Sequence, residues 1–166
     1  AGIRTIDQSA VTGATGNTID ISEFVGTAAT TLTGSTIGST TFTGGAGADT
    51  ITGGSAADSF IASAGNDIVS AGGGTIVDTF SFSGTLLAGN SELSATYDGG
   101  DGTDIVDISS DGATIVDADF RGFTAIETLT TGDGTNSITL GTNANASSIY
   151  TIVGGTGVDT ITAGAG

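Results

Sequence analysis

The chain has 166 residues, in which 15 Asp and 3 Glu face only two cations, Arg4 and Arg121, so the net charge is −16. This charge disfavours nucleic acid and anionic membrane as partners, because both would be repelled. The sequence contains no His or Cys, which excludes the usual zinc sites and histidine triads, and no apolar run approaches the roughly 18–20 residues that span a bilayer.

Composition alone leaves open whether the chain folds, because glycine-rich and acidic chains are often disordered. Apolar residues nevertheless make up 37% of the sequence, and they recur in phase. Ile51, Phe60 and Val69 recur once per nonapeptide, and each follows an aspartate by two positions. Disorder does not require such a phase, so we expect a folded repeat.

Residues 1–43 precede the clearest repeats. Leu32, Ile37 and Phe42 recur at a regular short interval and predict short, irregular β coils with these side chains inside. The segment SEFVGTAATTL (22–32) is compatible with a helical turn or with a longer loop. We therefore expect residues 1–43 to be irregular coils that lead into a solenoid.

Residues 44–81 contain three consecutive nonapeptides: GGAGADTIT (44–52), GGSAADSFI (53–61) and ASAGNDIVS (62–70). The first matches the pattern Gly-Gly-x-Gly-x-Asp-x-apolar-x in full and the other two match it in part, with Asp49, Asp58 and Asp67 at the acidic position. Glycine is required where a turn has positive φ or approaches its neighbour closely. Such a turn followed by a short strand is half a coil of a flattened solenoid, with the apolar residue inside.

Two nonapeptides complete one coil, so every second turn lies on the same edge. Asp49 and Asp67 are then expected to flank one cation, with Asp58 on the opposite edge. The position that should stack on Asp58 is Ile76, and the nearest acid, Asp78, is displaced by two positions after a run of three glycines. A bulge is needed to bring Asp78 into place.

Residues 82–166 are expected to continue the solenoid. GTLLAGNSELSATY (84–97) is compatible with a helical turn or a loop, and DGGDGTDIVD (98–107) repeats the motif with Asp98 and Asp101 as further oxygen donors. We expect Asp107 to face solvent. The last copy is GGTGVDTIT (154–162), and the AGAG after it resembles the start of another copy, so we expect one continuous solenoid cut from a longer chain. The inward positions of this region are predicted to be Val106, Ile126, Leu129, Ile138, Leu140 and Ile161.

The nonapeptides resemble the calcium-binding repeats of RTX proteins, which form parallel β-helices. The Thr-, Ala- and Gly-rich sequence between them resembles bacterial surface-layer proteins that contain such repeats. The resemblance implies an all-β fold, a right-handed parallel β-helix or β-roll, with Ca²⁺ bound by Gly-Asp turns. Calcium binds six to eight oxygens, from carboxylates and backbone carbonyls, and stacked turns offer both. The candidate ligand positions are Asp49, Asp58, Asp67, Asp78, Asp101, Asp104 and Asp159, together with Gly45, Gly47, Gly100, Gly102, Gly155 and Gly157.

The alternative for each aspartate is an ordinary turn residue, because Asp is favoured in tight loops. The resemblance implies an extracellular, calcium-dependent structural protein of the bacterial cell surface that assembles with copies of itself into a surface layer or filament. Cell-surface polysaccharide is a further expected partner. The alternative function is a calcium-dependent folding and secretion module of a larger exported enzyme, toxin or adhesin.

The sequence gives less support to two other functions, an ice-binding or adhesive solenoid and a glycosidase. An ice-binding or adhesive solenoid needs a continuous Thr-x-Thr row, which Thr50 and Thr52 begin and residues 59–61 and 68–70 interrupt. A glycosidase needs two carboxylates at a suitable distance, a condition that 18 acids meet in any fold. We therefore expect no catalytic activity, and we expect the chain to be disordered where calcium is scarce and to fold outside the cell.

Overall fold

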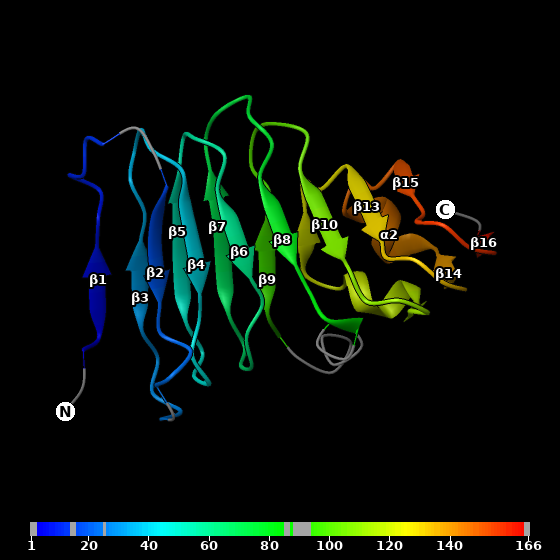
Figure 1. The fold of residues 1–166 in the computed structure, drawn as a ribbon, viewed down its shortest axis with the longest axis horizontal. Coiled ribbons are helices and arrows are strands. Elements are labelled where there is room, and N and C mark those ends of the chain that lie inside the picture. Colours follow the sequence, from blue (N-terminus) through cyan, green and yellow to red (C-terminus); the bar gives the residue numbers. More distant parts are fainter. Residues whose placement is uncertain (1–2, 14–15, 25, 85–86, 88–93, 165–166) are drawn as a thin grey trace.

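The computed structural model describes residues 3–13, 16–24, 26–84, 87 and 94–164. These residues form a parallel β-solenoid of about six turns, with strands stacked along the long axis of the molecule (Figure 1). The predicted all-β class and parallel coils are confirmed. No helix of the described part is long and apolar enough to cross a membrane.

The described strands form three parallel sheets. Sheet 1 consists of β1 (Thr5–Asp7), β3 (Thr31–Thr33), β5 (Thr50–Gly54), β7 (Ile68–Gly72), β9 (Thr96–Asp98) and β12 (Phe123–Thr124). Sheet 2 consists of β2 (Asn17–Asp20), β4 (Thr40–Thr43), β6 (Ser59–Ile61), β8 (Thr79–Ser81), β10 (Ile105–Ile108), β13 (Thr128–Thr131) and β15 (Thr151–Val153). Sheet 3 consists of β11 (Thr114–Ile115), β14 (Ser137–Leu140) and β16 (Thr160–Ala163).

Coil length changes along the chain. Thr50 pairs with Ile68, so this coil has the length of two nonapeptides, as the sequence predicts. Ser59 pairs with Thr79, so the next coil on that side is longer by two positions, which the turn after Gly72 absorbs. In sheet 3, Ser137 pairs with Thr160, and the coils there are longer again.

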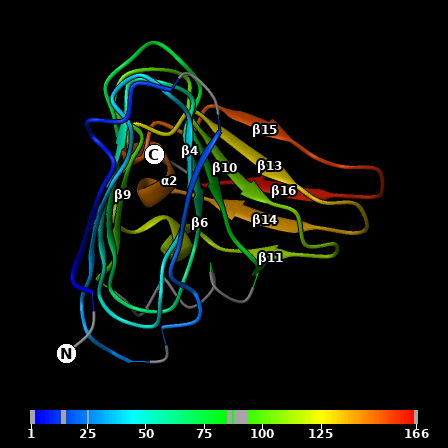
Figure 2. The ribbon, with the colours of Figure 1, turned by 60° about the vertical axis from the view of Figure 1, so that its left-hand side comes forward.

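The longer coils have room for a third side. Chain order runs from sheet 1 to sheet 2 in the first coils, and from sheet 1 through sheets 2 and 3 after β9. In Figure 2 the strands of sheet 3 extend to one side of the two-sheet part. The short helix α2 (Thr142–Ala146) follows β14, at the point of the coil where a further strand of sheet 1 would come. It packs on β12 and on the 3-10 helix η1 (Asp117–Phe120).

The core lies between sheets 1 and 2, where large rings stack from coil to coil. Phe42, Phe60 and Phe80 stack with ring centroids 5.0 and 4.9 Å apart, all from sheet 2. In the later coils the stacked aromatic rings come from sheet 1 instead, where the ring centroids of Tyr97 and Phe123 are 4.8 Å apart. Smaller aliphatic residues occupy the strands of the other sheet in each case, such as Ile51 and Val69 beside the first stack and Val106 and Leu129 beside the second.

Most predicted inward residues are buried, including Ile51, Phe60, Val69, Val106, Ile126, Leu129 and Ile138. Two predictions were wrong. Ile37 is 54% exposed because it lies in the turn between β3 and β4, and Ile161 is 50% exposed although it aligns with Ile138, because no described coil covers it. Asp107 is half-buried on β10, not fully solvent-facing, and Leu140 is half-buried.

The two segments whose local structure was left open differ in outcome. In the segment 22–32, the described residues up to Thr30 form a loop without a helix, and β3 begins at Thr31. The loop is therefore the correct alternative for this segment. Residues 85–86 and 88–93 of the segment 84–97 lie outside the described residues, so its helix-or-loop alternative stays a prediction, and the segment ends in the strand β9.

Candidate metal site

The glycine-rich turns stack in three columns along the solenoid. Column I holds the turns that lead into sheet 1, including 44–49 and 62–67. Column II holds those that lead into sheet 2, including 53–58, 72–78 and 99–104. Column III holds the turns between sheets 2 and 3, which are 109–113, 132–136 and 155–159.

In columns I and II the motif carboxylates form a ladder between coils. In column I, the N–H of Thr30 donates to Oδ1 of Asp49 at 2.8 Å, and the N–H of Asp49 donates to Oδ1 of Asp67 at 2.9 Å. Each acid thus accepts the main-chain donor at the same motif position one coil earlier. The structure therefore brings Asp49 and Asp67 together on one edge.

Column II continues the same ladder over more coils. The N–H of Asp58 donates to Oδ1 of Asp78 at 2.6 Å, and that of Asp78 donates to Oδ1 of Asp104 at 2.8 Å. Asp78 therefore stacks on Asp58 despite its displacement in sequence. The N–H of Asp104 donates in turn to Oε2 of Glu127 at 2.8 Å.

Sequence reasoning missed Glu127 as a member of column II. It also missed Thr30 and Thr40, whose N–H groups donate to Asp49 and Asp58. The available signal was the spacing to the next inward residue: Glu127 precedes Leu129 by two positions, as Asp104 precedes Val106. The absence of glycine around Glu127 concealed the match.

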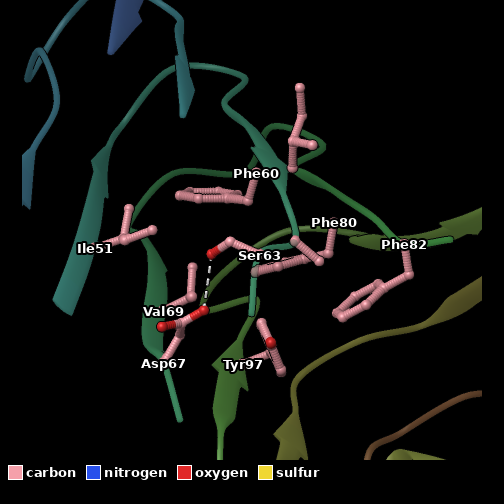
Figure 3. Close-up of a pocket in the computed structure, with 10 residues that line it drawn as sticks. Ile51, Phe60, Ser63, Asp67, Val69, Phe80, Phe82 and Tyr97 are labelled. Atoms are coloured by element: carbon pink, nitrogen blue, oxygen red, sulfur yellow. Dashed lines mark hydrogen bonds between the residues drawn. The ribbon is translucent and has the colours of Figure 1, made fainter. Parts of the chain in front are cut away.

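The second oxygen of each acid differs in its surroundings. Oδ2 of Asp49 accepts the N–H of Gly45 at 3.0 Å, and Oδ2 of Asp58 accepts the N–H of Gly54 at 2.6 Å. Oδ2 of Asp67 accepts the hydroxyl of Ser63 at 3.0 Å, and Figure 3 shows this bond at the edge of the core. Oδ2 of Asp104 is buried and has no hydrogen-bond partner among the described residues.

Backbone carbonyls of one turn face the backbone of the next. A Cβ placed on Gly47 would lie 2.6 Å from the carbonyl oxygen of Ala28, and one on Gly102 would lie 2.6 Å from that of Ile76. Gly102 also has φ +149°, a conformation that favours glycine. The columns therefore line up carbonyl oxygens as well as carboxylates.

Burial raises the pKa of four of these carboxylates, those of Asp58, Asp67, Asp78 and Asp104. Asp49, Asp58, Asp67, Asp78 and Asp104 are all 6% exposed or less. Burial, with the charges of Asp104 and Asp58, raises the pKa of Asp78 to about 7. Burial raises the pKa of Asp67 to about 6, with a contribution from Asp49. A buried carboxylate of this kind is stabilised by a proton or by a cation.

The pKa of Asp104 is raised to about 6 by burial and by the charges of Glu127 and Asp98. Asp98 lies at the start of the same turn and accepts the N–H of Gly100 at 3.3 Å, while Asp101 is exposed at its tip. The turn 98–104 thus contains one orphaned buried oxygen and two further acids, of which Asp98 acts electrostatically on Asp104.

The donor set fits calcium better than a metal that needs clustered side chains. Within the described part of the chain, no three acidic side chains come together into a group that could hold a metal by themselves. Calcium does not need such a group, because carbonyl oxygens contribute to its shell of six to eight ligands. Buried acids, an orphaned Oδ2 and rows of carbonyls are the donors that this shell uses.

Column III places Asp159 in the last motif turn, with Gly155 and Gly157 beside it. Oδ1 of Asp159 accepts two hydrogen bonds from Asn136, from its N–H at 3.0 Å and from its Nδ2 at 2.9 Å. Gly157 has φ +148°, like Gly102 in column II. Asn136 was not singled out from the sequence.

Residues 36–75 and 151–166, about a third of the chain, match the family model described as RTX calcium-binding nonapeptide repeat (4 copies). The match includes turns of all three columns and omits the turn 99–104. No curated protein and no solved structure matches the chain. The two matched segments are therefore similar to RTX calcium-binding nonapeptide repeats, and repeats of this family bind Ca²⁺.

Proposed function

We propose that this chain is a non-catalytic, calcium-ordered structural module of a secreted bacterial protein, in which Ca²⁺ at columns I and II stabilises the solenoid. The observation behind the proposal is the ladder of buried carboxylates, with raised pKa values at Asp67, Asp78 and Asp104, in a chain with only two arginines. These acids cannot all be ionised side by side without a compensating positive charge.

The proposed ligands are those of the stacked turns. Asp49 and Asp67 contribute to column I, and Asp58, Asp78 and Asp104 contribute to column II, with Asp101 at the tip of its last turn. Carbonyl oxygens of the glycine-rich turns complete the shell. The bound ion supplies positive charge, and the chain supplies preformed oxygens held by strand pairing on either side.

Calcium then stabilises the fold by mass action. An ion that binds only the folded chain adds about 2.7 kcal/mol at 100 times its dissociation constant. Several such sites amount to a large part of the roughly 5–15 kcal/mol that stabilises a typical domain. The proposal therefore expects the fold to form at extracellular calcium levels and not at the low cytoplasmic level.

We further propose that the ordered solenoid assembles with copies of itself at the cell surface. Support comes from the two end coils, where β1 and β16 each pair on one side only among the described strands. Uncovered strand edges pair with other chains unless they are protected. Tyr150, Val153 and Val158 are also exposed in the last coil. In a module of a larger exported protein, the same edges are covered by further coils of one chain.

The test is a calcium titration of the metal-depleted protein, followed by far-UV circular dichroism, with magnesium as the control ion. A gain of β-structure with calcium and not with magnesium supports the proposal, and an unchanged spectrum overturns it. Sedimentation velocity on the same samples separates the finer alternatives. Calcium-dependent oligomers favour self-assembly, and an ordered monomer favours the module of a larger protein.

A further inference from the structure

Column III differs from the other two columns at the motif position. Asn136, fully buried and uncharged, stands where columns I and II have acids. Its Oδ1 accepts the N–H of Ala113 at 2.8 Å. Its Nδ2 donates to the carbonyl oxygen of Gly132 at 2.9 Å and to Oδ1 of Asp159 at 2.9 Å. Contacts on both ends of the amide fix its orientation.

The position of Nδ2 has a chemical meaning. It lies between the carbonyl oxygen of Gly132, in its own turn, and the carboxylate oxygen of Asp159, in the next turn of the column. Carbonyl and carboxylate oxygens are the two kinds of oxygen that calcium binds. An amide NH₂ group directs partial positive charge at both of them. No cation is needed at this joint to hold the two turns together.

Resting on the proposed function, we infer that the Asn136 amide takes the place of a calcium ion in column III. The three-sheet section, residues 105–164, then stays folded without calcium, whereas the two-sheet section, residues 30–104, needs the ion. At this joint Asp159 is a hydrogen-bond acceptor and not a calcium ligand.

The half-buried carboxylate of Asp117, in the same section, is also satisfied without an ion, and the buried polar atom that lacks a partner in the described part of this section is an uncharged one, the hydroxyl of Thr131. The carboxylate of Asp117 accepts the N–H groups of Gly141 at 2.7 Å and Ala144 at 3.0 Å, and the Nδ2 of Asn143 at 2.8 Å. These bonds tie the start of α2 to the coil below. In column II, by contrast, Oδ2 of Asp104 has no partner among the described residues.

The three-sheet section also has its own buried apolar core. Val106, Ile108, Ile115, Phe120, Ile126, Leu129 and Ile138 are all at most 1% exposed. We therefore expect the three-sheet section to stay folded with or without calcium, and the two-sheet section to be ordered only when calcium is bound.

Hydrogen–deuterium exchange of the full chain tests this division. In calcium-depleted buffer, amides of β14 and β16 should exchange at least about tenfold more slowly than those of β5 and β7, as expected for separate cooperative units. Calcium should then protect β5 and β7. Equal exchange of both sections without calcium, with protection of both on its addition, overturns the inference and leaves the proposed function standing. No effect of calcium on any segment overturns the proposed function itself.

The variant Asn136→Asp tests the role of the amide. It removes both Nδ2–H donors and places a second carboxylate against Asp159. We expect loss of protection in β14 and β16 without calcium, and its recovery when calcium is added. The control Asn145→Asp adds the same charge at an exposed site on α2 and should change neither. If Asn136→Asp keeps full protection without calcium, the amide does not have this role.

Discussion

The main-chain N–H of Asp49 donates to Oδ1 of Asp67 across one coil of the solenoid, at 2.9 Å. The carboxylate of Asp67 is therefore a structural acceptor as well as a charge. The two roles can be separated by substitution. Asparagine keeps an oxygen that accepts this N–H and removes the charge, whereas alanine removes both.

The double variant Asp49→Asn/Asp67→Asn should raise the calcium concentration at the midpoint of folding by about tenfold, equivalent to ~1.4 kcal/mol. The reason is that two charged ligands of column I are lost while the ladder bonds remain. The measurement is a calcium titration followed by circular dichroism.

The matched control is Asp7→Asn/Asp20→Asn, which removes the same charge from exposed positions on β1 and β2. Asn at these sites preserves the turn bonds to the N–H groups of Ser9 and Ser22. If the control shifts the midpoint as far as the column I variant, the effect is one of net charge, and the assignment of Asp49 and Asp67 is wrong.

Without calcium, the stability of the chain should fall as the pH rises from 5 to 8. Burial raises the folded-state pKa of Asp78 to about 7 and those of Asp67 and Asp104 to about 6, above the ordinary value of 3.8. A raised folded-state pKa contributes stability that is complete below the unfolded pKa and is lost as the pH rises through the folded one. Far-UV circular dichroism of the calcium-depleted chain from pH 5 to 8 measures this trend as a loss of β-structure, because protons take the place of the ion in the two-sheet section at the lower pH.

Saturating calcium should weaken or reverse this dependence, because the ion binds the deprotonated carboxylates. Asp78→Asn should flatten the slope between pH 5 and 8 in the absence of calcium. A metal-free stability that is level or rising over this range would contradict the account of the ladder.

The nonapeptides predicted most of the two-sheet section because turn, acid and inward residue recur in fixed order there. The pairing of Asp49 with Asp67 followed from a coil of two nonapeptides alone. The pairing of Asp58 with Asp78 needed the structure, since the turn after Gly72 absorbs two extra positions.

The three-sheet section was harder to predict because its longer coils do not consist of two nonapeptides. Glu127 occupies a motif position without glycines in its turn. Asn136 instead keeps two motif glycines, Gly132 and Gly134, but has an amide in place of the acid. Ile161 shows the limit of periodicity in another way: its register is that of an inward residue, but burial depends on a coil above it.

Gly74→Ala should destabilise the calcium-bound protein by about 1–3 kcal/mol. Gly74 has φ +148°, and a Cβ there would lie 2.7 Å from the carbonyl oxygen of Ser55 in the turn below. Thermal unfolding in saturating calcium measures the loss. The neighbouring Gly73 has no atom within 4 Å of a Cβ and no positive φ, so Gly73→Ala is the control and should be neutral or slightly stabilising.

Asp117→Ala should lower stability by about 1–2 kcal/mol, the range of a lost helix cap, and by the same amount with and without calcium. The carboxylate holds the start of α2 through donors of Gly141, Asn143 and Ala144. Although burial acts in the opposite direction, these hydrogen bonds keep the pKa of Asp117 below its ordinary value, so the contribution is present at neutral pH.

Urea unfolding of the Asp117→Ala variant, followed by exchange at β14, measures this loss in the section that contains α2. The exposed Asp111, in the neighbouring turn, provides the control Asp111→Ala, which removes the same charge and should change little. A loss that appears only in calcium-depleted buffer would mean that α2 and the calcium columns are stabilised together. In that case the three-sheet section would not fold independently of the calcium-dependent two-sheet section.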